Sequence, residues 1–361
     1  MTIPLKTINA VLMIAIGLIS STGCCEDETT ASSTTGAGAE YVIYAPSISL
    51  RAQLVAIEEV CRFADTNATS IGCVVIIDIK NDDVIAVADC GGQDGDERPF
   101  ALHKKIEPGH LISPITAAIA LDTGAAASVE SKFSSDRNEA SFAEFRLPSD
   151  GHDDNRTETS VSNAILKSSN VVMSKIGILC GARELYDGYA KFGLATALRK
   201  PEKWCRGERS RIPIGQGFRV SAIELAKAYA ILARGGCTTN GEQVISSTSA
   251  ESLLAVLEGV VQDGTGHRAA VENIRISGKT STSLRSSDGW HYEPGKYISA
   301  FASIFPADKP QFAMVVWFET ARNGNEDNPG WHHGGGRAAL ASREIIRRLL
   351  ASPRMCSLGL D

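Results

Sequence analysis

The spacing of apolar positions predicts a β-rich segment near the start of the chain, a helical middle and a second β-rich segment near the end. Residues 52–64 carry apolar side chains at helical spacing, with one face apolar. Residues 73–79 and 84–88 are β-rich runs separated by the polar turn 80–83. The start of the globular region is therefore predicted to be one helix followed by a β-hairpin.

Helical spacing then dominates until strand character returns. The pattern predicts helices at 114–121, 161–179, 184–192, 222–233 and 250–261, strands at 274–283, 298–305 and 311–318, and a closing helix at 338–350. Two strands, an inserted helical block and three further strands can pair into one sheet that helices cover, with a helical lobe to one side. The predicted fold class is therefore α/β, of the α+β type.

The first forty residues predict export. Lys6 precedes an apolar run at 10–19, and small residues lead to Cys24. Gly23-Cys24 is similar to a bacterial lipidation site, although Ser21 stands where that pattern has Leu, so a lipoprotein and an uncleaved membrane anchor both stay open. The predicted boundaries, taken with the globular region, are a signal or anchor at 1–23, a disordered linker at 24–40, one domain at 41–352 and a tail at 353–361.

Composition narrows the choice of partners and cofactors. The 361 residues carry a formal net charge of -6, which argues against nucleic-acid binding. The nine Cys contain no C-x-x-C spacing, so neither a zinc site nor a redox motif is predicted, and the disulfide pairing stays open. His291 and His332-His333 lack a carboxylate or Cys at ligand spacing. We therefore expect no metal and no organic cofactor.

Three short segments carry the candidate chemistry, and they resemble the three motifs of penicillin-binding proteins, in that family's order. The family writes Ser-x-x-Lys after Glu-Pro-Gly, then Ser-x-Asn, then Lys-Thr-Gly-Thr. The matching positions here follow Glu107-Pro108-Gly109 and are His110, Ser113, Ser168, Asn170, Lys279, Thr280 and Thr282. The runs 213–217, 225–230, 263–270 and 334–336 are also similar to family segments.

This resemblance implies a transpeptidase domain of the class B penicillin-binding type, with a five-stranded antiparallel sheet flanked by helices plus a helical lobe. It implies an extracytoplasmic protein of bacterial peptidoglycan metabolism, whose active members form an acyl-enzyme on the motif Ser. Its implied partners are the peptidoglycan stem peptide, β-lactams, other cell-wall synthesis proteins and, through the N-terminus, the cytoplasmic membrane.

The catalytic positions depart from the family pattern. His110 replaces the nucleophilic Ser, Ser113 replaces the Lys and Ser281 replaces the Gly of the third motif. No Lys in the chain has Ser or Thr three residues before it, so the motif is not displaced elsewhere. We therefore expect a pseudo-transpeptidase that binds or scaffolds, with Ser168, Asn170 and Lys279 holding an anionic peptide end.

Two alternatives to this pseudo-transpeptidase stay open. The first is an active enzyme with unorthodox chemistry, in which His110 is the base and Ser113 the nucleophile. The second is a structural envelope lipoprotein with a vestigial cleft. In the family, Gly at the position of Ser281 lets the substrate backbone approach the strand edge, so the Ser281 side chain is expected to crowd the cleft.

Overall fold

A computed structural model describes residues 47–64, 69–91, 100–150, 158–286, 291–321 and 334–350. Its main sheet has five strands in the order β2-β1-β7-β6-β5, and every neighbouring pair is antiparallel. The predicted α/β class and the predicted five-stranded antiparallel sheet are therefore confirmed. The bounds of its strands are β1 Thr69–Asp78, β2 Val84–Cys90, β5 Ser277–Ser286, β6 Tyr292–Phe305 and β7 Phe312–Ala321.

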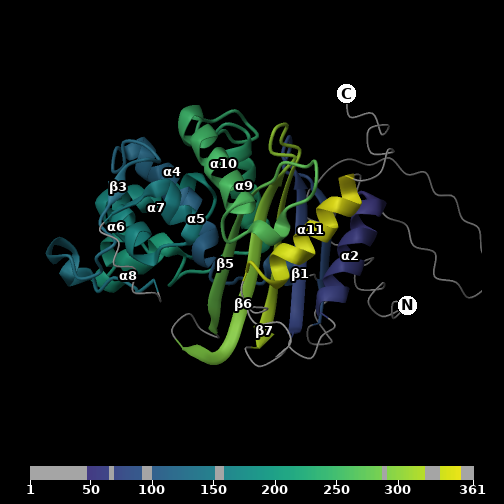
Figure 1. Cartoon of the computed structure of the whole chain (residues 1–361), viewed down its shortest axis with the longest axis horizontal. Helices are drawn as coiled ribbons and strands as arrows, with labels where there is room; N and C mark the ends of the chain where they lie inside the picture. The colour runs from purple at the N-terminus through teal and green to yellow at the C-terminus, as the bar shows by residue number, and fades with distance from the viewer. Residues whose placement is uncertain are drawn as a thin grey trace, which may run out of the picture.

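Helices cover both faces of the sheet, because alternate residues of each strand point to opposite sides. On one face, α2 and α11 lie side by side and pack on the side chains of Val74, Val316 and Phe318 (Figure 1). On the other face, α9 packs against β1 and β7, which carry Val75, Val315 and Trp317, and α10 packs against β5. The helices α4 to α8 extend this side into a helical lobe. The bounds are α2 Leu50–Ala64, α3 Phe100–His103, α4 Ser113–Thr123, α5 Val161–Lys167, α6 Asn170–Cys180, α7 Ala182–Lys191, α8 Arg206–Arg211, α9 Ala222–Ala233, α10 Ser247–Gln262 and α11 Arg337–Leu350.

The single helix predicted over 161–179 is wrong, because the chain forms two helices with a break at Ser168. Ser168 adopts the left-handed conformation with φ 57°, which ends α5. Ser169 then caps α6 by accepting a hydrogen bond from the Val172 N–H. The chain therefore changes direction between α5 and α6, and the Ser168 side chain lies at this bend.

Several smaller elements have too weak a pattern to predict. They include the two-stranded sheet of β3 (Lys132–Phe133) and β4 (Thr159–Ser160), together with short 3-10 turns such as η2 (Gly109–Ile112). Cys73, Cys180, Cys205 and Cys237 carry free thiols. None of the helices within the described ranges combines the length and the apolar character that a membrane crossing requires. The predicted signal, Cys24, the linker and the tail lie outside those ranges.

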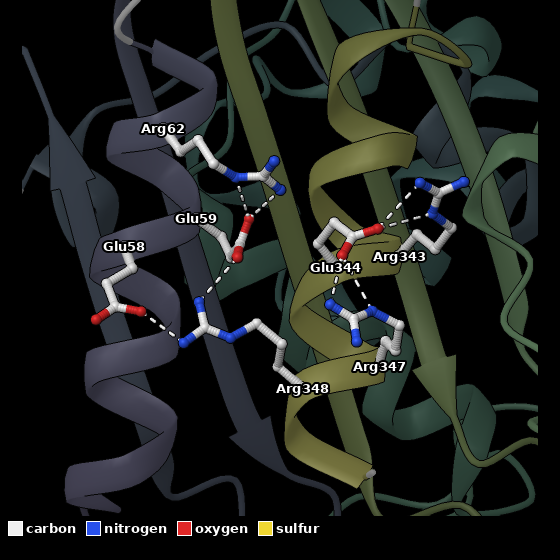
Figure 2. A network of polar contacts seen from close by, with 7 residues as sticks. All are labelled: Glu58, Glu59, Arg62, Arg343, Glu344, Arg347 and Arg348. Atoms are coloured by element: carbon white, nitrogen blue, oxygen red, sulfur yellow. Dashed lines mark hydrogen bonds and ion pairs between the residues drawn. The ribbon is translucent and has the colours of Figure 1, made fainter. Parts of the chain in front are cut away.

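An ion-pair network joins the first and last helices of the described fold (Figure 2). Arg348 of α11 donates hydrogen bonds to Glu58 at 2.5 Å and to the buried Glu59 at 2.8 Å, both on α2. Arg51 of α2 donates in return to the Arg348 carbonyl at 2.7 Å. Arg347, by contrast, pairs only within α11 in this network, with Glu344.

Replacing Arg348 by Met is expected to lower the free energy of unfolding by about 1 kcal/mol, because Glu59 loses a partly buried charged donor. Arg347→Met removes an exposed pair within one helix and is expected to cost about 0.3 kcal/mol. Urea unfolding of both variants measures the difference. Equal losses would contradict a role for Arg348 in joining the two helices.

Candidate ligand-binding cleft

A cleft of about 460 Å³ opens beside β5, where the helical lobe meets the sheet. It brings together residues from all three predicted motifs, which span positions 110 to 282 of the sequence. Its walls are formed by His110, Asp150, Ser168, Thr265, His267, Arg268, Thr280, Ser281, Thr282, Gly335 and Gly336. Ser113, Asn170 and Lys279 do not line it but contact residues that do. The three predicted segments therefore meet at one cleft.

The segment before His110 is fixed by one backbone–backbone hydrogen bond and by hydrogen bonds to the Glu107 carboxylate. The Gly109 N–H donates to the Gly215 carbonyl at 3.1 Å. The buried carboxylate of Glu107 accepts from the Gly217 N–H at 2.9 Å and from the Tyr292 hydroxyl. These contacts join the Glu-Pro-Gly turn at 107–109 to the Gly-x-Gly turn at 215–217. Together they hold His110 at the cleft wall.

His110 is held by two hydrogen bonds that define its tautomer. The Asn170 side-chain amide donates to the Ser149 carbonyl at 2.6 Å, so its oxygen faces His110 Nε2 at 2.9 Å. Nε2 therefore carries the proton, and Nδ1 accepts from the Ser113 hydroxyl at 2.8 Å. Both ring nitrogens are thereby occupied. The Ser113 side chain is fully buried beneath the imidazole.

The electrostatics keep this imidazole neutral. Burial is the main cause that lowers the pKa of His110 to about 3, and the nearby charge of Lys279 lowers it further. The hydrogen bond to Asn170 acts in the opposite direction and raises the pKa, but it is the smaller effect. A neutral ring matches the tautomer deduced from the hydrogen bonds. His110 is therefore uncharged throughout the physiological pH range.

Lys279 is the buried cation behind the cleft. It comes from β5, and its ammonium group donates to the Ser168 hydroxyl at 2.6 Å and to the Thr280 carbonyl at 3.0 Å. Burial alone lowers its pKa to about 7. The left-handed turn at Ser168 is what aims that hydroxyl at Lys279. The charge of Lys279 therefore depends on pH near neutrality.

Asp150 is a site residue that the sequence did not reveal. Its carboxylate accepts from the Ser169 hydroxyl at 2.8 Å and from the Val171 N–H at 2.9 Å. It thus binds the N-terminal end of α6, where a negative charge is favourable. No local motif marks Asp150, because its role depends on a helix that starts twenty residues later.

Strand β5 supplies the opposite wall. The Thr280 hydroxyl lies 2.6 Å from that of Thr265, and Thr282 accepts from the Gly334 N–H at 2.9 Å. The Ser281 hydroxyl is buried and is without a hydrogen-bond partner among the described residues. A Cβ placed on Gly109 would collide with this hydroxyl, so Ser281 fills the space between β5 and Gly109.

The rim residues His267 and Arg268 were also missed. They lie in the 263–270 run, whose resemblance was recognised only through its glycines and alanines. They add an imidazole and a guanidinium group to the cleft wall, whereas Lys279 lies behind that wall.

The sequence comparisons agree with this geometry. Residues 72–335 match the family described as the penicillin binding protein transpeptidase domain. The chain belongs to this family. The match covers the sheet and all three motif segments, so the recognition made from the motifs is confirmed.

Curated relatives of the penicillin-binding family show moderate similarity. The probable peptidoglycan D,D-transpeptidase PenA of Neisseria meningitidis serogroup A is 27% identical over 306 residues, covering 75% of this chain and 51% of that protein. The peptidoglycan D,D-transpeptidase FtsI of Escherichia coli K12 is 25% identical over 341 residues, covering 84% and 55%. The chain thus spans about half the length of these relatives.

Solved structures of penicillin-binding transpeptidase domains share the fold. The transpeptidase domain of Burkholderia pseudomallei penicillin-binding protein 3 has a TM-score of 0.71 at 24% identity, covering 87% of this chain and 96% of that chain. The transpeptidase domain of FtsI4 from Legionella pneumophila has a TM-score of 0.65 at 23% identity, covering 84% and 98%. These likenesses establish the architecture of the described core.

Proposed function

We propose that this chain is a pseudo-transpeptidase of peptidoglycan metabolism, which binds stem peptides without forming an acyl-enzyme. The observation that carries the proposal is the environment of His110. The imidazole occupies the position of the family nucleophile, and both of its nitrogens are engaged by Ser113 and Asn170. Loss of a nucleophilic group lowers rates by orders of magnitude, even where binding groups remain.

The hydrogen bond between Ser113 and His110 favours the active-enzyme alternative, but the burial of Ser113 argues against it. The Ser113 hydroxyl donates to His110 Nδ1 at 2.8 Å, as a nucleophile donates to a general base. The side chain of Ser113, however, is 0% exposed and lies beneath the ring. A substrate carbonyl cannot reach it while His110 keeps its position. The pair is therefore better suited to fixing the ring than to attacking a substrate.

The remaining groups favour an anionic peptide end as ligand. Lys279 supplies a charge, while Ser168, Thr280 and Thr282 place hydroxyls around the cleft and Arg268 adds a cation at its rim. Asn170 must release either His110 or Ser149 before it can hold a substrate amide. The open cleft supports a binding function over a vestigial one. Non-covalent occupation by β-lactams follows from the same groups.

We place this function outside the cytoplasm, with the N-terminus holding the chain at the cytoplasmic membrane as a lipoprotein or an anchor. The names of the relatives PenA and FtsI, both peptidoglycan D,D-transpeptidases, support a setting in cell-wall synthesis. Docking onto other cell-wall synthesis proteins is part of the proposal. Mass spectrometry of the mature N-terminus tests whether Cys24 is lipidated or the anchor stays uncleaved.

A peptide ending in D-Ala-D-Ala is expected to bind saturably, and removal of the buried charge in Lys279→Met is expected to weaken binding about tenfold or more. Lys309→Met removes an exposed charge in the turn between β6 and β7 and serves as the matched control. Fluorescence polarisation with a labelled peptide measures both. Unchanged affinity in Lys279→Met would favour a vestigial cleft.

Peptide affinity is expected to depend on pH because of Lys279. Its pKa of about 7 leaves the ammonium mostly charged at pH 6 and about one-tenth charged at pH 8. Binding of a carboxylate should therefore weaken by up to about tenfold as the pH rises from 6 to 8. Arg at this position stays charged, so Lys279→Arg should bind with a flat pH profile. The same slope in both proteins would rule out Lys279 as the titrating group.

A further inference from the structure

The cleft carries two opposite charges on different walls. Asp150 lies on the wall of the helical lobe, because its carboxylate binds the start of α6. Arg268 lies on the wall beside the sheet, in the 3-10 turn η7 (His267–Ala269), which packs against α10 and α11. Both side chains are half-buried. A ligand in the cleft therefore meets a carboxylate on one side and a guanidinium group on the other.

Neither charge is neutralised within the part of the chain that the structure describes. The partners of Asp150 are the Ser169 hydroxyl and the Val171 N–H, and both are neutral donors. The start of α6 favours a negative charge but supplies no full cation. Among the described residues, Arg268 forms no ion pair with an acidic side chain, and Asp150 and Arg268 do not pair with each other. Both charges are therefore available to a ligand.

The buried ionisable groups of the site do not cancel these two charges. Lys279 lies behind the wall, where it donates to the Ser168 hydroxyl and the Thr280 carbonyl, and burial alone lowers its pKa. Burial is also the main reason why the low pKa of His110 keeps that ring neutral. Asp150 is the one acidic residue among the described residues that line the cleft. A positive group of a bound ligand therefore finds its partner at Asp150.

We infer that the cleft selects a zwitterionic peptide, whose side-chain ammonium group binds Asp150 and whose C-terminal carboxylate lies towards Arg268. Hydrogen bonds between charged groups are stronger than those between neutral groups, so each contact favours a ligand that carries the matching charge. Asp150 is then a specificity-determining residue, since selectivity is a difference between affinities. The inference rests on the proposed peptide binding and adds which kind of peptide the cleft prefers.

Isothermal titration of the whole chain with two matched peptides tests the inference. One is N-acetyl-Lys-D-Ala-D-Ala, which carries a side-chain ammonium group, and the other is the same peptide with that amine acetylated. The first peptide is expected to bind at least about fivefold more tightly, because only its ammonium group can form a charge-assisted contact with a half-buried carboxylate. Both peptides keep the C-terminal carboxylate, so the ratio of their affinities reports on the amine alone.

Three variants assign the two recognised groups of the peptide. Asp150→Asn removes the charge but keeps an oxygen that can accept from the Val171 N–H, and it should reduce the preference to within about twofold. Asp308→Asn removes an exposed charge in the turn between β6 and β7 and should keep the full preference. Arg268→Gln should weaken both peptides to a similar extent, since both end in a carboxylate. A merely structural role of Asp150 at α6 would lower both affinities and leave their ratio unchanged.

Equal affinities of the two peptides for the unmodified chain would overturn the inference and leave the proposed peptide binding intact. A preference that persists in a folded Asp150→Asn variant would overturn it as well. Binding of neither peptide at millimolar concentration would contradict the proposed function itself, and this inference with it. If Asp150→Asn does not fold, a third peptide with Glu in place of Lys is titrated against the unmodified chain. It should bind more weakly than the acetylated peptide, and equal or tighter binding would overturn the inference.

Discussion

The triple variant His110→Ser/Ser113→Lys/Ser281→Gly is expected to form a covalent adduct with a fluorescent penicillin, whereas the unmodified chain forms none. The changes rebuild Ser-x-x-Lys and Lys-Thr-Gly in a frame that already has the family fold. The His110→Ser change places a hydroxyl at the cleft wall, and Ser113→Lys supplies the neighbouring base. Gel fluorescence after denaturation measures the adduct. Covalent labelling is expected to rise at least about 100-fold over the unmodified chain, because the loss of a nucleophile lowers the rate of acylation by orders of magnitude.

The partial variants separate the contributions to this gain. His110→Ser alone provides a hydroxyl without a base, and Ser113→Lys alone provides a base without a nucleophile, so neither should approach the triple variant. Adding Ser281→Gly to the double variant tests whether the side chain against Gly109 hinders substrate. A folded triple variant that stays unlabelled would show that the cleft has diverged beyond its three motif positions.

Gly215→Ala is expected to have the largest effect on stability, above about 3 kcal/mol. Gly215 has φ +77°, which costs an L-residue about 1–2 kcal/mol. In addition, a Cβ there would collide with the Gly109 carbonyl oxygen and would lie 2.5 Å from the Gly109 nitrogen. Backbone atoms cannot rotate away as a side chain can, so η2 and His110 must move.

Gly217→Ala is the matched control for this clash. Gly217 also has a positive φ, +83°, but nothing lies within 4 Å of a Cβ built on it. Only the conformational cost of about 1–2 kcal/mol remains. Denaturant unfolding of both variants should therefore differ by more than about 1 kcal/mol. Equal stabilities would contradict the tight contact between Gly215 and Gly109.

Much of the fold follows from the sequence because the large elements bury apolar faces. The β-rich runs over 73–79 and 84–88 and the helical spacing over 222–233 correspond to β1, β2 and α9. The helix predicted over 161–179 fails because the apolar pattern is continuous on both sides of Ser168. The left-handed break places the Ser168 hydroxyl against Lys279, a contact between distant segments that the apolar pattern does not contain.

The site shows a similar limit. Motif spacing identified the segments that form the cleft, because the family frame around them is retained. The spacing of His110 and Ser113 already allowed these two side chains to pair, but it did not reveal that Asn170 of α6 holds the other ring nitrogen, since that contact joins two helical segments sixty residues apart. Asp150 was missed because it lies in no motif.

Intact-protein mass spectrometry after incubation with excess penicillin tests the central claim most directly. The unmodified chain is expected to keep its mass, because its only hydroxyl in the first motif is buried under a neutral His110. The same sample should still bind the D-Ala-D-Ala peptide reversibly. A stoichiometric mass increase equal to the antibiotic, mapped to Ser113 or His110, would contradict the account and establish an active acyl-transfer enzyme.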